Sequence, residues 1–309
     1  MKIQEPFHEG ELEVQKRLGL HTEAKQNSGV ITDSIVKGAF RFIEQQRMAV
    51  LGSIDQNENV WASVLVGQDG FMQAATEQLL TFDLSKITGN EHDPFWKNIK
   101  SQPQVGMLVI ELATRRRLRV NGSIRRSGEQ QLEFEVLESY PNCPKYIQRR
   151  EATITPAGGR IATSQVLKGD ALGAPQQAII NQADTLFVAS AHPERGVDAS
   201  HRGGNPGFVR IVDGRTLRIP DYTGNCMFNT LGNFISNPRA GLVFVNFENG
   251  TTLQLTGRAK ILWDEEDPED ETGGTKRFWE FHIDRWLEIE NGHALEWSFQ
   301  DYSPYNPGK

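Results

Sequence analysis

An arginine followed by two glycines is the pattern in this sequence best suited to bind a phosphate group. Arg202 directly precedes Gly203 and Gly204. The arginine guanidinium is planar and permanently charged, so it can hold two phosphate oxygens at once. Glycine has no side chain, which lets a ligand approach the backbone closely. A surface arginine beside a glycine-rich hairpin is the other interpretation, and these residues alone do not decide between the two.

A second segment places polar groups at the start of a predicted helix. The run 219–225 leaves a strand and leads into a helix predicted over 227–236, which carries Asn229 and Thr230 near its start. Unpaired backbone N–H groups make a helix N-terminus a natural anion site. A simple capped helix is the alternative, since Asn and Thr are ordinary capping residues. Together with Arg202, the segment favours phosphate binding, provided that the fold brings the two together.

A run of arginines in the first half is a further candidate. Arg115, Arg117 and Arg119 alternate along the start of a predicted strand, so they should share one of its faces, whereas Arg116 should point to the other. Such residues usually form surface ion pairs. The alternative is that they line a seam with the ligand site of the second half.

Other chemistries have little support. The seven histidines show no metal-ligand spacing, so we expect no metal site. The nucleophile elbow of hydrolases and the phosphate-loop pattern are missing from the sequence. The acidic run 264–271 is expected to be a solvated loop. Cys143 and Cys226 are the only cysteines, which argues against a disulfide framework and for a reducing compartment. These patterns assign no side chain a catalytic role.

The phosphate-binding pattern belongs to the second of two related halves. Residues 62–71 and 199–208 share Ala, Ser, two Gly and Phe at an offset of 137, and later residues repeat at an offset of 135. A period of this length indicates duplicated domains rather than a solenoid, whose repeats are roughly 20–50 residues long. In the first half, Leu65 occupies the position of Arg202. We therefore expect one intact ligand site.

Strand-length runs separated by turn residues fill both halves. In the first half the predicted strands are 49–53, 60–66, 70–74, 105–112, 118–124 and 132–137. In the second half they are 185–190, 207–212, 216–219, 240–247 and 252–261. Helices are predicted over 9–18, 34–46 and 176–183 and, from aromatic residues at helical spacing, over 276–289. We expect antiparallel barrels in two domains, 1–155 with a degenerate site and 156–309 with the intact one.

The composition limits the partners and the location. A net charge of −7 and a pI near 5.6 argue against nucleic acid, which normally needs a dense basic face. No apolar run reaches the length of a membrane span, and the first residues lack the apolar stretch of a signal peptide. The sequence therefore predicts a cytoplasmic protein that binds neither nucleic acid nor a membrane.

Several blocks of the chain carry a family resemblance. They are 201–208, 220–225, 228–233, 237–242 and 256–259, together with 7–11 and 142–149. The first five resemble the pyridoxamine 5'-phosphate oxidase-like flavin-nucleotide-binding proteins, and the last two resemble a two-copy branch of that group. The resemblance implies a mainly β fold with flanking helices, built from two tandem split β-barrels. The barrels would form an intramolecular pseudo-dimer that holds FMN in the groove between them.

The same resemblance implies which residues hold the flavin. The phosphate and the approach to it would fall on Arg202, Gly203, Gly204, Asn225, Asn229 and Thr230. Pro220 and Asp221 would lie near the isoalloxazine edge, and Lys145 and Arg149 would come over from the first copy to cover the flavin. Cys143 or His201 would lie near the redox edge.

An FMN-dependent oxidoreductase is the function that this resemblance favours. The flavin would pass hydride or electrons to an unknown small molecule, with NADH or NADPH as candidate donors. A flavin carrier or sensor, with a partner bound at 278–286, is one alternative, and a haem or deazaflavin binder on the same barrel is another. The chain lacks the Ser-Arg-Lys run and the arginine-bearing carboxyl terminus of true pyridoxamine phosphate oxidases, so vitamin-phosphate oxidation is not expected. The pseudo-dimer would act alone or pair as a homodimer.

Overall fold

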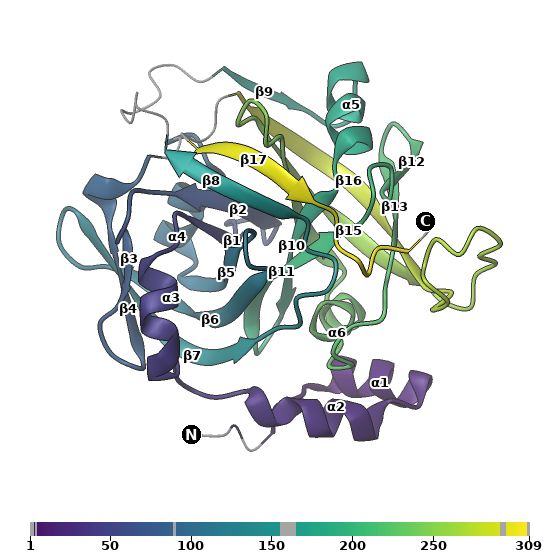
Figure 1. Cartoon of the computed structure of the whole chain (residues 1–309), viewed down its shortest axis with the longest axis horizontal. Helices are drawn as coiled ribbons and strands as arrows, with labels where there is room; N and C mark the ends of the chain where they lie inside the picture. Colours follow the sequence, from purple (N-terminus) through teal and green to yellow (C-terminus); the bar gives the residue numbers. More distant parts are fainter. Residues whose placement is uncertain (1–2, 4, 89–90, 155–164, 291–294, 308–309) are drawn as a thin grey trace.

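Two antiparallel sheets with the same strand order form the framework of the fold (Figure 1). The computed structural model describes all residues except 1–2, 4, 89–90, 155–164, 291–294 and 308–309. The first sheet has the order β2-β1-β5-β6-β7-β4-β3, and the second has the order β11-β10-β14-β15-β16-β13-β12. Each strand of the first sheet thus has one counterpart in the second. This duplication confirms the prediction of two tandem split barrels in a mainly β fold.

The strand bounds are as follows. The first sheet comprises β1 (Met48–Ile54), β2 (Val60–Val66), β3 (Met72–Ala74), β4 (Leu79–Asp83), β5 (Gln104–Glu111), β6 (Arg116–Arg126) and β7 (Gln131–Pro141). The second comprises β10 (Thr185–His192), β11 (Gly196–Gly203), β12 (Arg210–Asp213), β13 (Thr216–Pro220), β14 (Arg239–Val245), β15 (Thr252–Leu262) and β16 (Phe278–Ile289). In addition, β9 (Val166–Gly169) pairs with β16, and β8 (Arg149–Ile154) pairs with β17 (Leu295–Asp301).

A glycine marks the same bulge in both sheets. The register shifts between Asn121 and Gly122 where β6 meets β7, and between Thr256 and Gly257 where β15 meets β16. A Cβ atom on either glycine would lie 2.0 Å from a carbonyl oxygen of the neighbouring strand, so no other residue fits there. The bulges lie 135 residues apart, which is the offset seen in the sequence.

The two barrels meet through a reciprocal seam. The strand β2 packs against β14 of the second barrel, and its counterpart β11 packs against β5 of the first. A glycine lies at each crossing: a Cβ atom on Gly106 would come within 2.5 Å of the Val197 carbonyl oxygen, and one on Gly241 within 2.7 Å of the Ala62 nitrogen. A third hydrophobic core fills the seam between the cores of the two barrels. The pseudo-dimer is therefore one packed unit.

The helices flank the barrels. They are α1 (Glu9–Leu18), α2 (His21–Asn27), α3 (Phe40–Glu44), α4 (Pro94–Ser101), α5 (Ala174–Gln182) and α6 (Asn229–Ser236), with short 3-10 turns at Ser28–Val30, Lys37–Ala39 and Leu84–Lys86. The helices α4 and α6 are counterparts. Asn98 of α4 donates to Ser53 at 3.0 Å, and Asn233 of α6 donates to Ser190 at 2.9 Å. No described helix has the length and apolar character needed to cross a bilayer.

Several predicted elements were wrong or incomplete. The predicted helix 276–289 is the strand β16, in which buried Trp279, Phe281 and Ile283 alternate with polar residues. This period of two, and pairing with β13 and β15, outweigh the helical spacing of the aromatic residues. The predicted helix 34–46 is helical only from Lys37 to Glu44.

Two further strands differ from the prediction. The strand β11 was not predicted, although it carries Arg202, and the predicted strand 207–212 begins only at Arg210. The predicted boundary near residue 155 falls at the edge of 155–164, outside the described residues.

Candidate functional site

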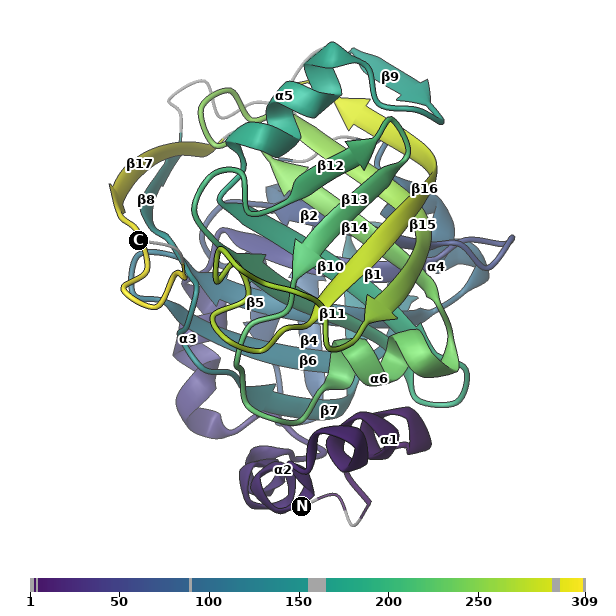
Figure 2. The ribbon, with the colours of Figure 1, turned by 90° about the vertical axis from the view of Figure 1, so that its right-hand side faces the viewer.

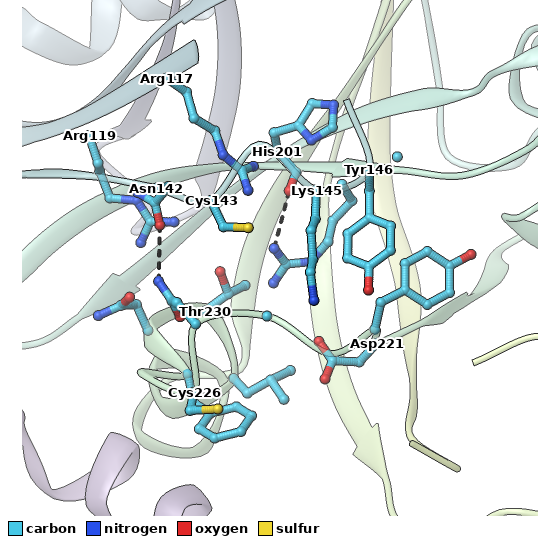
Figure 3. Close-up of a pocket in the computed structure, with 18 residues that line it drawn as sticks. Arg117, Arg119, Asn142, Cys143, Lys145, Tyr146, His201, Asp221, Cys226 and Thr230 are labelled. Atoms are coloured by element: carbon cyan, nitrogen blue, oxygen red, sulfur yellow. Dashed lines mark hydrogen bonds between the residues drawn. The ribbon is translucent and has the colours of Figure 1, made fainter. Parts of the chain in front are cut away.

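A cleft lies where the two copies meet. The first copy contributes β6 and the segment 142–146 that follows β7, and the second contributes β11, the loop 221–228 and the start of α6 (Figure 3). The cleft contains about 780 Å³ of empty space, part of it open to solvent.

Three cationic side chains converge in this cleft without a carboxylate to balance them. Arg117, Lys145 and Arg202 all line it, and none has a carboxylate oxygen within 4.0 Å among the described residues. The Nε atoms of Arg117 and Arg202 are buried without a hydrogen-bond partner, and the Nη1 atom of Arg202 reaches only the His201 carbonyl oxygen at 3.2 Å. Burial and then repulsion from Arg119 and Arg202 lower the pKa of Arg117 to about 9. Uncompensated, partly buried charge of this kind favours an anionic ligand.

Arg119 lies in the same cleft but is already paired. Its Nη1 atom donates to the Tyr140 hydroxyl and to the Asp198 carboxylate, each at 2.9 Å. Burial lowers its pKa, but Asp198 and Tyr140 outweigh that effect and hold the pKa above its usual value. Arg119 therefore joins the two copies, and its buried Nε atom remains without a partner.

The first copy shows how an anion completes this kind of site. Asp93 caps α4: its carboxylate accepts from the Phe95 N–H at 2.9 Å and the Ser63 hydroxyl at 2.6 Å, and from Gln254 Nε2 at 3.1 Å. At the offset of 135, the residue that corresponds to Asp93 is Phe228. Phe228 supplies no side-chain cap to α6. The second copy thus lacks the built-in anion of the first.

The same comparison holds for the strands beside the helices. Leu65 of β2 corresponds to Arg202 of β11, and Thr252 of β15 corresponds to Arg117 of β6. The positions that correspond to Arg202 and Arg117 at the Asp93 site, Leu65 and Thr252, thus carry no arginine, whereas the site at α6 draws one arginine from each copy. An external anion at the start of α6 would take the place of the missing carboxylate and would neutralise the two arginines.

The loop before α6 is held in an unusual conformation. Cys226 and Phe228 have φ angles of +61° and +62°, in the left-handed region that residues with side chains rarely adopt. Asn225 accepts from the Met227 N–H at 3.1 Å and donates to Asn142 of the first copy at 3.1 Å. The Nδ2 atom of Asn142 is buried without a partner. Backbone strain and an unsatisfied donor beside one cleft are typical of a binding site.

Aromatic rings form the outer wall of the cleft. The rings of Tyr146 and Tyr222 lie with their centroids 4.7 Å apart, and the Tyr146 hydroxyl donates to the Thr223 carbonyl oxygen at 3.0 Å. Below them Asp221 is paired with Arg277 at 3.0 Å, so its carboxylate brings little net negative charge to the cleft. The wall suits a flat, conjugated ligand.

Burial keeps His201 neutral. Burial and the neighbouring arginines lower its pKa well below the usual value. Both ring nitrogens are buried without a hydrogen-bond partner, although the ring lines the cleft. A neutral imidazole offers one donor and one acceptor, so His201 can bond to a ligand without adding charge.

The structure brings together most of the residues predicted for the site. The cleft is lined by Lys145, Arg202, Gly203, Asp221, Asn225, Asn229 and Thr230, and also by Cys143 and His201. Three predicted residues lie outside the lining. Arg149 is paired with Asp301 at 3.3 Å, the Gly204 N–H donates to the Asp184 carbonyl oxygen at 3.1 Å, and Pro220 ends β13 beside Phe278.

Sequence reasoning left other lining residues unassigned. Arg117 and Arg119 do share one face and reach the ligand site of the second copy, while Arg116 stacks on Phe42. Arg115 differs, because it lies in the turn before β6 and pairs with Asp301. The alternation of arginines in the sequence indicated a shared strand face. Only the three-dimensional packing of the two copies shows that the second copy covers this face.

One group of side chains has the spacing of metal ligands. His8, Glu9 and His192 place their ligand atoms within 4.8 Å of one another. The His8 Nδ1 atom, however, accepts from the Gly10 N–H at 3.2 Å, and the His192 Nδ1 atom accepts from the Glu194 N–H at 3.1 Å. The Nε2 atoms face the Asn233 and Glu9 oxygens, so both nitrogens of each ring are already used. This arrangement is a hydrogen-bonded contact that opposes metal binding.

A buried acid lies directly behind α6. Glu11 of α1 is 3% exposed and accepts from Asn229 and from the His8 N–H. Burial, followed by the charges of Asp198 and Glu138, raises its pKa to about 8. Glu11 is therefore largely protonated at neutral pH, which limits the negative charge behind the cleft.

The raised pKa of Glu11 makes folding stability pH-dependent. The folded state holds a proton that the unfolded state releases above pH about 4.5, so the free energy of unfolding should fall as the pH rises from 4.5 to 8. Glu11→Gln should remove up to about 4 kcal/mol of this decline between pH 5 and pH 8.5. Urea melts at pH 5 and pH 8.5 measure it, with the exposed neighbour substitution Glu13→Gln as control. Equal slopes in both variants would show that Glu11 does not hold the proton.

Comparison with known protein families finds a match for the second half of the chain. Residues 173–290 match the model of the family described as pyridoxamine 5'-phosphate oxidase. No curated protein matched the chain. Among solved structures, a putative pyridoxamine 5'-phosphate oxidase from Lactobacillus delbrueckii is 11% identical, with a TM-score of 0.31 over 38% of this chain and 94% of its own.

Two other similar structures are named for different ligands. The heme storage protein HutZ from Vibrio cholerae is 14% identical, with a TM-score of 0.29 over 38% of this chain and 94% of its own. An FAD-binding protein from Mesorhizobium loti is 13% identical, with a TM-score of 0.30 over 41% of this chain and 98% of its own. The matched range 173–290 contains β11, the loop 221–228 and α6. The second half of the chain, which carries these elements, is thus similar to the pyridoxamine 5'-phosphate oxidase family.

Proposed function

We propose that the cleft binds one FMN per chain and that the protein is a flavin-dependent oxidoreductase. The observation that carries the proposal is the difference between the two copies. At α4 Asp93 caps the helix N-terminus, whereas the uncapped start of α6 lines one cleft together with Arg202 of its own copy and Arg117 of the other. Similarity to this family supports a flavin as the source of the phosphate.

The residues of the cleft have distinct tasks in this proposal. Arg117, Arg202 and the first N–H groups of α6 bind the phosphate, and the Thr230 hydroxyl, held by Ser200 at 3.1 Å, orients it. Tyr146 and Tyr222 shield the outer side from water. A bound flavin supplies hydride or electron transfer, and the protein supplies position and electrostatics.

The electron acceptor and the electron donor are proposed by chemical class. The acceptor is an unidentified small molecule, and NADH or NADPH is the electron donor to test first. A single site per chain follows from the degenerate first copy, so a homodimer is not needed to complete it. A cytoplasmic location remains a prediction from the sequence.

An absorption spectrum tests the proposal. The purified protein is incubated with excess FMN, freed of unbound ligand and scanned in the visible range. We expect the two flavin bands at a ratio of one FMN per chain. A Soret band from co-purified haem would instead support the haem alternative, and a colourless protein that ignores FMN would refute flavin binding.

Turnover separates an enzyme from a carrier. The FMN-loaded protein is mixed with NADH or NADPH and an artificial electron acceptor, and oxidation of the nicotinamide is followed by its absorbance. Steady oxidation above the rate of free FMN is the expected result. Binding of FMN without such turnover, with either nucleotide, would favour the carrier or sensor.

A further inference from the structure

We infer that the N-terminal helical hairpin, formed by α1 and α2, positions the phosphate-binding loop 225–231, with Gln15 and Asn27 as positioning residues. The inference rests on the proposed function, because this loop is the part of the cleft assigned to the flavin phosphate. Both views show the hairpin against α6, on the outside of the second barrel (Figures 1 and 2). Neither Gln15 nor Asn27 lines the cleft. Their effect on a ligand must pass through the loop.

Two hairpin side chains bind backbone carbonyl groups of the loop. The Nε2 atom of Gln15, a fully buried residue, donates to the Met227 carbonyl oxygen at 3.2 Å. The Nδ2 atom of Asn27 donates to the Asn225 carbonyl oxygen at 2.8 Å. These bonds fix the backbone on both sides of Cys226, one of the two residues in the left-handed conformation.

The strain of the loop explains why external bonds are needed. Cys226 and Phe228 both have positive φ angles, and a residue with a side chain pays a conformational cost there. The loop has no regular hydrogen-bond ladder of its own that would fix this conformation. Contacts from the hairpin therefore select the conformation that leaves the start of α6 open to the cleft.

Two further hairpin residues bind α6 itself. The Glu11 carboxyl group accepts from the Asn229 amide, and the His8 Nε2 atom lies 3.0 Å from the Asn233 Oδ1 atom. Asn229 also lines the cleft. Bonds from the hairpin thus reach the loop and the first two turns of the helix.

A glycine contact brings the two helices unusually close. A Cβ atom on Gly10 would lie 2.3 Å from the Gly232 carbonyl oxygen, and one on Gly232 would lie 2.6 Å from the Glu11 nitrogen. Only glycine at both positions permits this approach. The hairpin is therefore fitted to α6 backbone against backbone, which suits an element that sets the position of the helix rather than one that merely covers it.

This arrangement couples docking of the hairpin to binding of the anion. If the docked hairpin favours the binding conformation of the loop, then a bound anion must favour the docked hairpin by the same factor. Phosphate or FMN should therefore slow amide hydrogen exchange in α1 and α2, although neither helix touches the ligand. Loss of a hairpin bond should weaken ligands that carry a phosphate and spare those that do not.

Paired titrations with FMN and riboflavin test the inference. Riboflavin lacks the phosphate, so it reports on the rest of the cleft. The test variant is Asn27→Ala and the matched control is Gln26→Ala, since both are exposed neutral amides on α2. Gln26 bonds to no loop residue in the described part of the chain. The variant Gln15→Ala removes the second hairpin contact. Its thermal unfolding temperature is recorded as a check on folding.

The expected result is selective loss of FMN affinity. Asn27→Ala should weaken FMN about three- to tenfold, the range of one ordinary hydrogen bond, and should leave riboflavin unchanged. Gln26→Ala should change neither. Equal FMN affinity in Asn27→Ala and Gln26→Ala would overturn the inference. Equal weakening of FMN and riboflavin would overturn it too, because the hairpin would then only support the fold.

A phosphate titration keeps the inference distinct from the proposed function. If the wild-type protein binds no flavin, the proposed function fails, and inorganic phosphate becomes the probe. The hairpin inference then requires that phosphate raise the unfolding temperature of wild type and Gln26→Ala more than that of Asn27→Ala. Identical shifts in all three proteins, or no shift in any, would reject it.

Discussion

Replacement of Arg202 by alanine is expected to weaken FMN binding by about 10- to 100-fold, the range of a charge-assisted hydrogen bond. Arg202 lines the cleft with a buried, unpartnered Nε atom, and no carboxylate oxygen of the described residues lies within 4.0 Å of its charged group. Its charge is therefore available to the phosphate. Fluorescence quenching of FMN on titration with protein gives the affinity directly.

The matched control is Arg218→Ala. Arg218 lies on β13 of the same barrel, outside the cleft, and its charge is paired with Glu265 at 2.9 Å. This variant should leave FMN affinity within about twofold, since half-exposed ion pairs contribute little. Riboflavin affinity should change little in either variant. If Arg202→Ala retained wild-type FMN affinity, Arg202 would be removed from the site.

The stability of the ligand-free protein gives a second, opposite readout for Arg202. A partly buried charge without a paired carboxylate destabilises the folded state, and burial lowers the pKa of Arg202 despite the attraction of Asp221. Ligand-free Arg202→Ala should therefore unfold at the same or a higher urea concentration than wild type. A large loss of stability would mean that Arg202 has a structural role instead.

The duplicated architecture was predictable because its signals are local or repeated. Glycines such as Gly122 and Gly257 are required by backbone contacts, so they recur at a fixed offset and show the repeat. The strand β16 was mistaken for a helix because its aromatic residues also fit a helical period. The alternation from Trp279 to Asp284, buried and polar in turn, was the better signal, since it covers consecutive residues.

The candidate site was only partly predictable because it is built across the seam. Arg202, Asn229 and Thr230 come from one copy and belong to recognisable motifs. Arg117 comes from the other copy, and its alternation with Arg119 shows a shared strand face but not what covers that face. The role of Asp93 as a built-in anion is a three-dimensional relation among a helix cap, β2 and β15, so the sequence showed only that the first copy has Leu65 where the second has Arg202.

Substitution of Gly241 by alanine is expected to destabilise the protein by about 2–3 kcal/mol, the range of overpacked cores. A Cβ atom at this position would lie 2.7 Å from backbone atoms of Trp61 and Ala62 in the other copy, and backbone cannot turn aside as a flexible side chain can. The barrels must therefore move apart. Because the cleft is formed by both copies, FMN affinity should fall together with stability. Urea unfolding measures the first effect and FMN titration the second.

Two further alanine variants test the reason for this effect. Gly106→Ala meets the Val197 carbonyl oxygen at 2.5 Å on the counterpart crossing and should behave alike, since the seam is reciprocal. Gly214→Ala, in the turn between β12 and β13, meets nothing within 4 Å and should be nearly neutral. If all three variants unfolded at the same urea concentration, close packing of the seam would not be what holds the copies together. If Gly241→Ala lost stability but kept full FMN affinity, the cleft would tolerate movement of the barrels, and the first copy would contribute less to the ligand than Arg117 and Lys145 suggest.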